Sequence, residues 1–316
     1  MSKAEFKNID HFKKISNEFR GTNEKEWLLS PNQLLCLYKI TQIKDNNTST
    51  NAHYAESLYS EICKLLHINC CKIELVKSRK GIGIISYCFL QNNEELIDFN
   101  ALIQNIRQDF VPKSLKCKKT KEYYSIQLIL EAIKAVIPNR DEYKQITKQL
   151  FTLIIMDALC DHYDRNASNL ALIRNHDNPH HPYFKFAGAY DNGTSLWVSL
   201  PIDIAKNYLN DPNGIEKLDS CIVSKIGISI ERGTTYSELL SYLFSFHHEE
   251  CKEFIETLDC ILTEKVLIDI IFQKKYKGLD NVYKKLILIK LIYNKEKIIS
   301  LYKHYSNSNI KIKTKK

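Results

Sequence analysis

The chain has 316 residues, of which 44% are hydrophobic and 26% charged, and a formal net charge of +8. This composition is typical of a folded globular protein, and the length predicts two lobes. No stretch interleaves basic with aromatic residues on one face, which disfavours a nucleic-acid-binding role. No apolar run approaches the ~18 residues that a membrane span needs.

The N-terminal stretch and the cysteines bear on where the protein works. The stretch MSKAEFKNIDHFKK is charged and has no apolar core, so we expect no signal peptide. The ten cysteines include no C-x-x-C pair and no metal-binding spacing. We therefore expect all ten to be reduced, as in an intracellular environment.

The first part of the chain, residues 1–95, reads as a small sheet with one helix against it. The apolar, β-branched run LLCLYKIT (34–41) predicts a strand, and EWLLS before it predicts the hairpin partner. Apolar residues at helical spacing in AHYAESLYSEICKLLHI predict the helix. CKIELVKS, GIGIISYCFL and EELIDF predict further strands.

The remaining chain, residues 96–316, is mainly helical in its pattern. YYSIQLILEAIKAVI and DEYKQITKQLFTLIIMDALC predict two amphipathic helices, separated by the breaker PNRD. YFKFAGAYDNGTSLW predicts a short strand that enters a turn, and helical runs follow. The predicted fold is therefore α+β, with a small β-rich N-terminal lobe and a larger helical C-terminal lobe.

Two polar motifs lie between apolar segments of the C-terminal part. In DALCDHYDRNASNLALI, Asp164 can accept a proton from an attacking hydroxyl, and Asn169 can offer an amide oxygen to Mg²⁺. In AYDNG, Asp191 precedes a glycine turn and can supply a second ligand to the ion. Each motif alone is common in ordinary turns, but their order and apolar flanks favour a site for phosphoryl transfer.

Phosphoryl transfer also needs a cation on the phosphates. Lys39 lies within the predicted strand CLYKIT, where an isolated lysine usually faces solvent. The following helix carries Glu56 and Glu61, and a glutamate of such a helix can hold the lysine toward the α- and β-phosphates. FRGTNEKEW, upstream, has one glycine and is by itself a weak indication of a phosphate loop.

Taken in order, these segments resemble the HipA-like serine/threonine protein kinases, especially the compact members without the extra N-terminal subdomain. RGTNEKEWLLSP resembles the phosphate-loop segment of that family, and LCLYKI resembles its lysine strand. MDALCDHYDRNASNLALI is similar to its D-R-H-x-x-N loop, and AGAYDNGTSLW to its metal-binding segment. The last two motifs are together fairly specific, whereas the first two are not.

The resemblance implies a two-lobed protein-kinase-like fold and transfer of phosphate from ATP, with Mg²⁺, to a serine or threonine of a protein substrate. It also implies autophosphorylation, with Thr22 or Ser16 as the candidate acceptor. The implied site residues are Asp164 as the catalytic base, Lys39 on the ATP phosphates with Glu56 as its partner, Asn169 and Asp191 on Mg²⁺, Gly21 and Thr22 in the phosphate loop, and Cys88, Phe89 and Leu90 at the adenine hinge.

Two positions depart from the family pattern. Asn166 stands where the family has a histidine, and His162 where it usually has an asparagine. Neither removes a metal ligand or the catalytic carboxylate, but both bear on how the substrate is positioned. His162 is either an orienting or substrate-contacting residue or a buried structural histidine.

Two other functions stay open at this stage. One is a lipid or small-molecule kinase, although D-N-G in place of D-F-G and the positive net charge disfavour it. The other is a nucleotide-binding pseudokinase that acts as a binding module. Relatives of this type are bacterial toxins, which an antitoxin can bind, or effectors delivered into host cells. We therefore expect the protein in the bacterial cytoplasm or inside a host cell.

Overall fold

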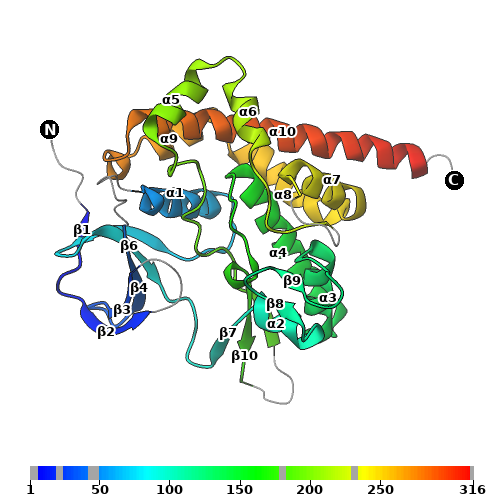
Figure 1. The fold of residues 1–316 in the computed structure, drawn as a ribbon, viewed down its shortest axis with the longest axis horizontal. Helices are drawn as coiled ribbons and strands as arrows, with labels where there is room; N and C mark the ends of the chain where they lie inside the picture. Colours follow the sequence, from blue (N-terminus) through cyan, green and yellow to red (C-terminus); the bar gives the residue numbers. More distant parts are fainter. Residues whose placement is uncertain (1–5, 19–23, 42–49, 178–182, 229–233, 314–316) are drawn as a thin grey trace.

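The computed structural model describes residues 6–18, 24–41, 50–177, 183–228 and 234–313. A β-rich N-terminal part is followed by a larger, mainly helical part (Figure 1). This arrangement confirms the α+β fold that the sequence predicts.

A six-stranded sheet forms the N-terminal part, in the order β1-β5-β6-β4-β3-β2, with only β1 and β5 parallel to each other. Its strands are β1 (Lys7–Asn8), β2 (Lys13–Glu18), β3 (Lys25–Leu29), β4 (Leu35–Ile40), β5 (Ile73–Ser78) and β6 (Gly81–Tyr87). The predicted hairpin of β3 and β4 is confirmed, whereas β1 and β2 were not predicted. Side chains alternate along β4, so Tyr38 packs in a small apolar cluster on one face while Lys39 points to the opposite face.

A second sheet corrects one sequence-based expectation. The EELIDF segment does form a strand, β7 (Glu94–Asp98), but it is not part of the N-terminal sheet. It pairs instead with β10 (Ala171–Asn175), which in turn pairs with β11 (Tyr183–Phe186). The pattern of a strand identifies its buried face and leaves its neighbour undetermined. The lobe boundary near residue 95 stays a prediction.

Helices make up most of the C-terminal part. The elements, with the helix of the N-terminal part first, are α1 (Ala52–Leu65), α2 (Phe99–Ile106), the strand pair β8 (Phe110–Val111) and β9 (Lys116–Cys117), α3 (Ile126–Val136), α4 (Arg140–Leu159), the 3₁₀ turn η1 (Ala167–Asn169), α5 (Ile202–Asn210), α6 (Gly214–Ser220), α7 (Tyr236–Phe246), α8 (His248–Ile261), α9 (Glu264–Ile271), the 3₁₀ turn η2 (Lys274–Tyr276) and α10 (Asn281–Lys313). The predicted break between α3 and α4 is confirmed. Asn139 caps α4 there by accepting hydrogen bonds from the N–H groups of Asp141 and Glu142. Within the described chain, no helix has the length and apolar character to cross a membrane.

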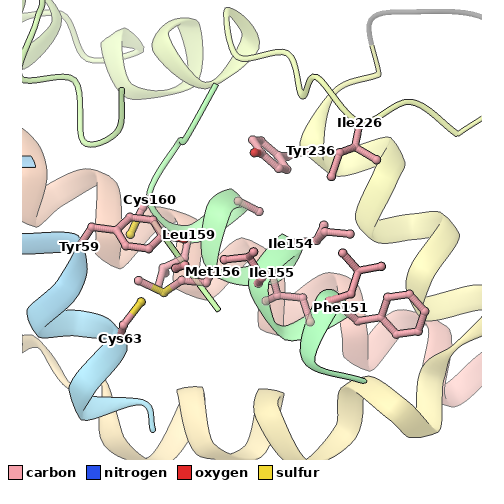
Figure 2. Packing of buried hydrophobic residues seen from close by; sticks show 14 of the residues in the cluster. Tyr59, Cys63, Phe151, Ile154, Ile155, Met156, Leu159, Cys160, Ile226 and Tyr236 are labelled. Carbon is pink, nitrogen blue, oxygen red and sulfur yellow. The ribbon is translucent and has the colours of Figure 1, made fainter. Parts of the chain in front are cut away.

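The main apolar core joins α1 to the helical part. Tyr59 and Cys63 of α1 lie against the end of α4, where Figure 2 shows Met156, Leu159 and Cys160. All ten cysteines are free thiols in the structure. Since α1 shares this core, any side chain that it presents toward the sheet has a fixed position relative to the C-terminal part.

Candidate active site

Lys39 lies between two carboxylates. Its Nζ atom is 2.8 Å from Oε1 of Glu56 and 2.7 Å from Oδ1 of Asp191. Burial acts to lower the pKa of Lys39, but the two carboxylates outweigh it and hold this pKa above its usual range. Burial alone would raise the pKa of Asp191, yet the charge of Lys39 lowers the pKa of that carboxyl to about 2. Lys39 and Asp191 are therefore both charged at neutral pH.

The fold explains why Glu56 is the glutamate at this position. Lys39 points from β4 toward α1, and Glu56 lies on the face of α1 that meets the sheet. Glu61 points elsewhere and forms an ion pair with Lys275 at 2.8 Å. The turn after Asp191 also packs on α1, because a Cβ atom at Gly193 would lie 3.4 Å from Cγ of Glu56. Of the two glutamates considered from the sequence, only Glu56 contacts Lys39.

A second lysine lies opposite Lys39 in the sheet. Lys25 of β3 pairs in register with Lys39 of β4, so both side chains leave the same face. The charge of Lys25 contributes to lowering the pKa of Asp191. Lys25 lies in the segment RGTNEKEWLLSP, and no role was predicted for this lysine from the sequence.

The loop of residues 164–169 is held by its own asparagines. The side chain of Asn169 donates to the carbonyl oxygen of Asp164 at 2.9 Å, and that of Asn166 donates to Oδ1 of Asp164 at 3.2 Å. Asn166 also accepts a hydrogen bond from the N–H of Ser168 and so caps η1. Burial raises the pKa of the Asp164 carboxyl, while the hydrogen bond from Asn166 opposes this shift. Asn166, which departs from the family pattern, thus shapes the loop and contacts the carboxylate.

Arg165, for which the sequence predicted no role, connects this loop to the rest of the site. Its side chain is 1% exposed. Nε and Nη2 each donate to Asp157 of α4 at 2.8 Å, and Nη2 also donates to Oδ1 of Asn192 at 2.7 Å. Nη1 donates to the carbonyl oxygens of Asn169 and Tyr190. The signal in the sequence was Asp157 within the apolar run LIIMDALC, because a buried carboxylate needs a partner.

His162 is a buried structural residue. It is 0% exposed, so it does not contact a substrate. Its Nε2 atom lies 3.4 Å from the carbonyl oxygen of Asp191 and 3.3 Å from Oγ1 of Thr194. Burial, with the nearby charge of Arg165, lowers the pKa of His162 to about 4, so the ring is neutral at physiological pH. Its burial argues against contact with a substrate, and its contacts with Asp191 and Thr194 position the turn that follows Asp191.

The oxygen atoms of Asn169 and Asp191 suit a hard cation. The Nδ2 atom of Asn169 is engaged with Asp164, and its Oδ1 atom accepts no hydrogen bond from the described residues. The same holds for Oδ2 of Asp191, whose Oδ1 binds Lys39. Among the described residues no group of three or more His, Cys, Asp or Glu side chains forms a metal cage. Mg²⁺ is typically held by one or two protein oxygens together with phosphates and water, so this donor set fits it.

The predicted hinge residues lie within the described part of the chain, whereas the predicted phosphate-loop residues do not. Cys88 follows β6, and its N–H donates to the carbonyl oxygen of Leu35 at 2.9 Å. Phe89 and Leu90 pack with an apolar cluster that includes Ala171 of β10, two residues after Asn169. Their segment thus connects the two sheets beside the 164–169 loop. Gly21 and Thr22 lie outside the described residues, and Ser16 is exposed on β2.

Comparison with known proteins adds information at the level of the fold. No family model matches the sequence, and no curated protein matches it. The solved structure of the proinflammatory kinase CtkA of Helicobacter pylori matches with a TM-score of 0.78 at 17% identity, over 96% of this chain and 98% of CtkA. HipA of Shewanella oneidensis MR-1, solved with HipB and operator DNA, matches with a TM-score of 0.53 at 11% identity, over 93% of this chain and 63% of HipA. The chain has the fold of the HipA-like kinases.

In this kinase fold, the segment that leads to Asp191 is held against the N-terminal part through Gly188. The N–H of Ala189 donates to the carbonyl oxygen of Asn69, and the N–H of Cys71 donates to that of Ala189. Gly188 has a φ of 79°, and a Cβ atom there would lie 2.3 Å from the carbonyl oxygen of Asn69. The absence of a side chain at Gly188 therefore permits this contact.

We predict that Gly188→Ala lowers the free energy of unfolding by roughly 1–3 kcal/mol, through backbone strain and the clash with Asn69. Urea denaturation measures this loss. Gly81→Ala is the matched control, because Gly81 also has a positive φ, 139°, but an added Cβ would meet its nearest neighbour at 3.8 Å. Equal losses for the two variants would show that the contact with Asn69 contributes nothing.

Proposed function

We propose that this protein is an ATP- and Mg²⁺-dependent protein kinase that phosphorylates serine or threonine hydroxyls, including its own. The observation that carries the proposal is the placement of Lys39 between Glu56 and Asp191. The charge of Asp191 also acts on Asp164, whose carboxylate is partly exposed, so both acidic groups belong to one site. The HipA-like fold supports this assignment.

Each residue has a distinct part in the proposed reaction. Lys39, oriented by Glu56, binds the α- and β-phosphates of ATP. Asn169 and Asp191 hold Mg²⁺, which when bound neutralises phosphate charge. Asp164 orients the acceptor hydroxyl and takes its proton as the new O–P bond forms, and ADP leaves with the electron pair of the broken bond. Cys88, Phe89 and Leu90 contact the adenine.

Two biological settings suit such a kinase: a toxin that an antitoxin binds, and an effector that acts on a protein inside a host cell. HipA belongs to a toxin–antitoxin system, and CtkA is described as a proinflammatory kinase. This chain matches CtkA over nearly all of both chains but covers 63% of HipA. The proposal keeps both settings.

Autophosphorylation with labelled ATP and Mg²⁺, followed by phosphoamino-acid analysis, tests the proposal. We expect label on serine or threonine in the wild type, and a loss of label in Asp164→Ala and in Asp191→Asn. Asp203→Asn is the control for loss of a carboxylate, because the Asp203 side chain is exposed on α5.

Other outcomes would favour the alternative functions. If the wild type takes up no label although Mg·ATP raises its melting temperature, the protein is a pseudokinase or a kinase of another acceptor. A screen of lipid and small-molecule acceptors then separates these two. A wild type that neither takes up label nor binds nucleotide contradicts the proposal.

A further inference from the structure

Of the cations already described, neither Lys39 nor Arg165 is free to act on the acceptor side of the transferred phosphate. Arg165 follows Asp164 directly, but its guanidinium is buried and donates all its hydrogen bonds to Asp157, Asn192 and two backbone carbonyls. Lys39 is held by the two carboxylates on the nucleotide side. Negative charge on the transferred phosphoryl group is commonly stabilised by a further cation in this reaction.

Lys225 lies on the segment between α6 and α7, and its side chain is half-buried. Ser224 and Ile226 on either side of it are buried, 2% and 1% exposed, so Lys225 points the opposite way. The charge of Lys225 acts to lower the pKa of the Asp164 carboxyl, yet no ion pair of 4.0 Å or less joins the two groups. Among the described residues, Lys225 has no ion-pair partner within this limit.

The backbone on both sides of Lys225 is anchored. The N–H of Gly227 donates to the carbonyl oxygen of Tyr124 at 2.9 Å, just before α3. The N–H of Ser224 donates to the carbonyl oxygen of Thr234 at 2.9 Å, and two residues later the hydroxyl of Tyr236 donates to the carbonyl oxygen of His162, two residues before Asp164. Ile226 belongs with Tyr236 to the main core (Figure 2). These contacts hold Lys225 near Asp164 without engaging its ammonium group.

We propose that the ammonium group of Lys225 contacts the phosphoryl group during its transfer to the acceptor. This inference rests on the proposed kinase function. The acceptor oxygen forms a bond to phosphorus while the bond to the β-phosphate oxygen breaks; the acceptor proton moves to Asp164, and ADP leaves with the electron pair. Lys225 transfers no proton and stabilises the phosphoryl oxygens through its charge. Because it is not paired with Asp164, it leaves that carboxylate free to take the proton.

The test compares Lys225→Met and Lys225→Arg with the wild type. Two rates are measured with labelled ATP and Mg²⁺, those of autophosphorylation and of ATP hydrolysis without a protein acceptor. We expect Lys225→Met to lower both rates roughly 10- to 100-fold, because the same phosphoryl group moves in each reaction. Binding of Mg·ATP, followed by thermal shift, stays unchanged, since Lys225 acts on the acceptor side. Lys225→Arg keeps the charge and retains most of the activity.

Lys265→Met is the matched control, because Lys265 is exposed on α9, outside the site. Wild-type rates in Lys225→Met would overturn the inference and leave the kinase function standing. Loss of autophosphorylation with full ATP hydrolysis would also overturn it, since Lys225 would then bind an acidic acceptor segment. If Lys225→Met is destabilised, Lys225→Arg is the deciding variant. Phosphoryl transfer by Lys225→Arg near the wild-type rate supports the inference, and a loss of transfer equal to that of Lys225→Met contradicts it. A wild type that transfers phosphate neither to itself nor to water, and that does not bind Mg·ATP, overturns the kinase function, and this inference with it.

Discussion

Replacing Arg165 with methionine is expected to lower the free energy of unfolding by about 3–5 kcal/mol. The change removes a guanidinium that is 1% exposed and leaves the Asp157 carboxylate buried without its cation. It also leaves the carbonyl oxygens of Asn169 and Tyr190 without the donor that joins the two parts of the site. Denaturant unfolding followed by circular dichroism measures the loss.

A control variant separates the loss of this buried ion pair from the general effect of removing an arginine. Arg140→Met removes an exposed arginine at the start of α4, and we expect little change in stability from it. The double variant Asp157→Asn with Arg165→Met should be more stable than Arg165→Met alone, because it no longer buries an unpaired carboxylate. A loss below about 1 kcal/mol in Arg165→Met would contradict the prediction.

Lys39→Met is expected to reduce phosphoryl transfer by roughly 10²–10³-fold. The variant lacks the only charge that bridges Glu56 and Asp191 in the described site, so ATP loses a phosphate contact. The pKa of Asp191 should also rise from about 2 toward its usual range, because Lys39 lowers it. Initial rates measured against ATP concentration, with Mg·ATP binding measured separately, divide the loss between affinity and turnover.

Glu56→Gln is the companion to this experiment. It keeps the ammonium group and its contact with Asp191, so we expect a smaller loss than in Lys39→Met. Lys265→Met, on the surface of α9, controls for the removal of a lysine. Normal transfer by a folded Lys39→Met variant would contradict a role of this lysine on the nucleotide.

The sequence alone determined features that depend on neighbours along the chain. The β3–β4 hairpin, α1 and the break before α4 follow from apolar spacing and turn residues, which act over a few positions. The resemblance of the Lys39, Asp164 and Asp191 segments to those of the HipA-like kinases implied the kinase-like fold. Such patterns can be recognised in the sequence before the fold is known.

Only the tertiary structure decided the pairings between distant segments. It placed β7 beside β10, chose Glu56 over Glu61, and joined Arg165 to Asp157 and Asn192. It also brought Lys225 near Asp164, although no motif marks that lysine. The physical reason is that burial and packing select these partners: a buried charge requires a partner, but the sequence does not specify which distant residue reaches it.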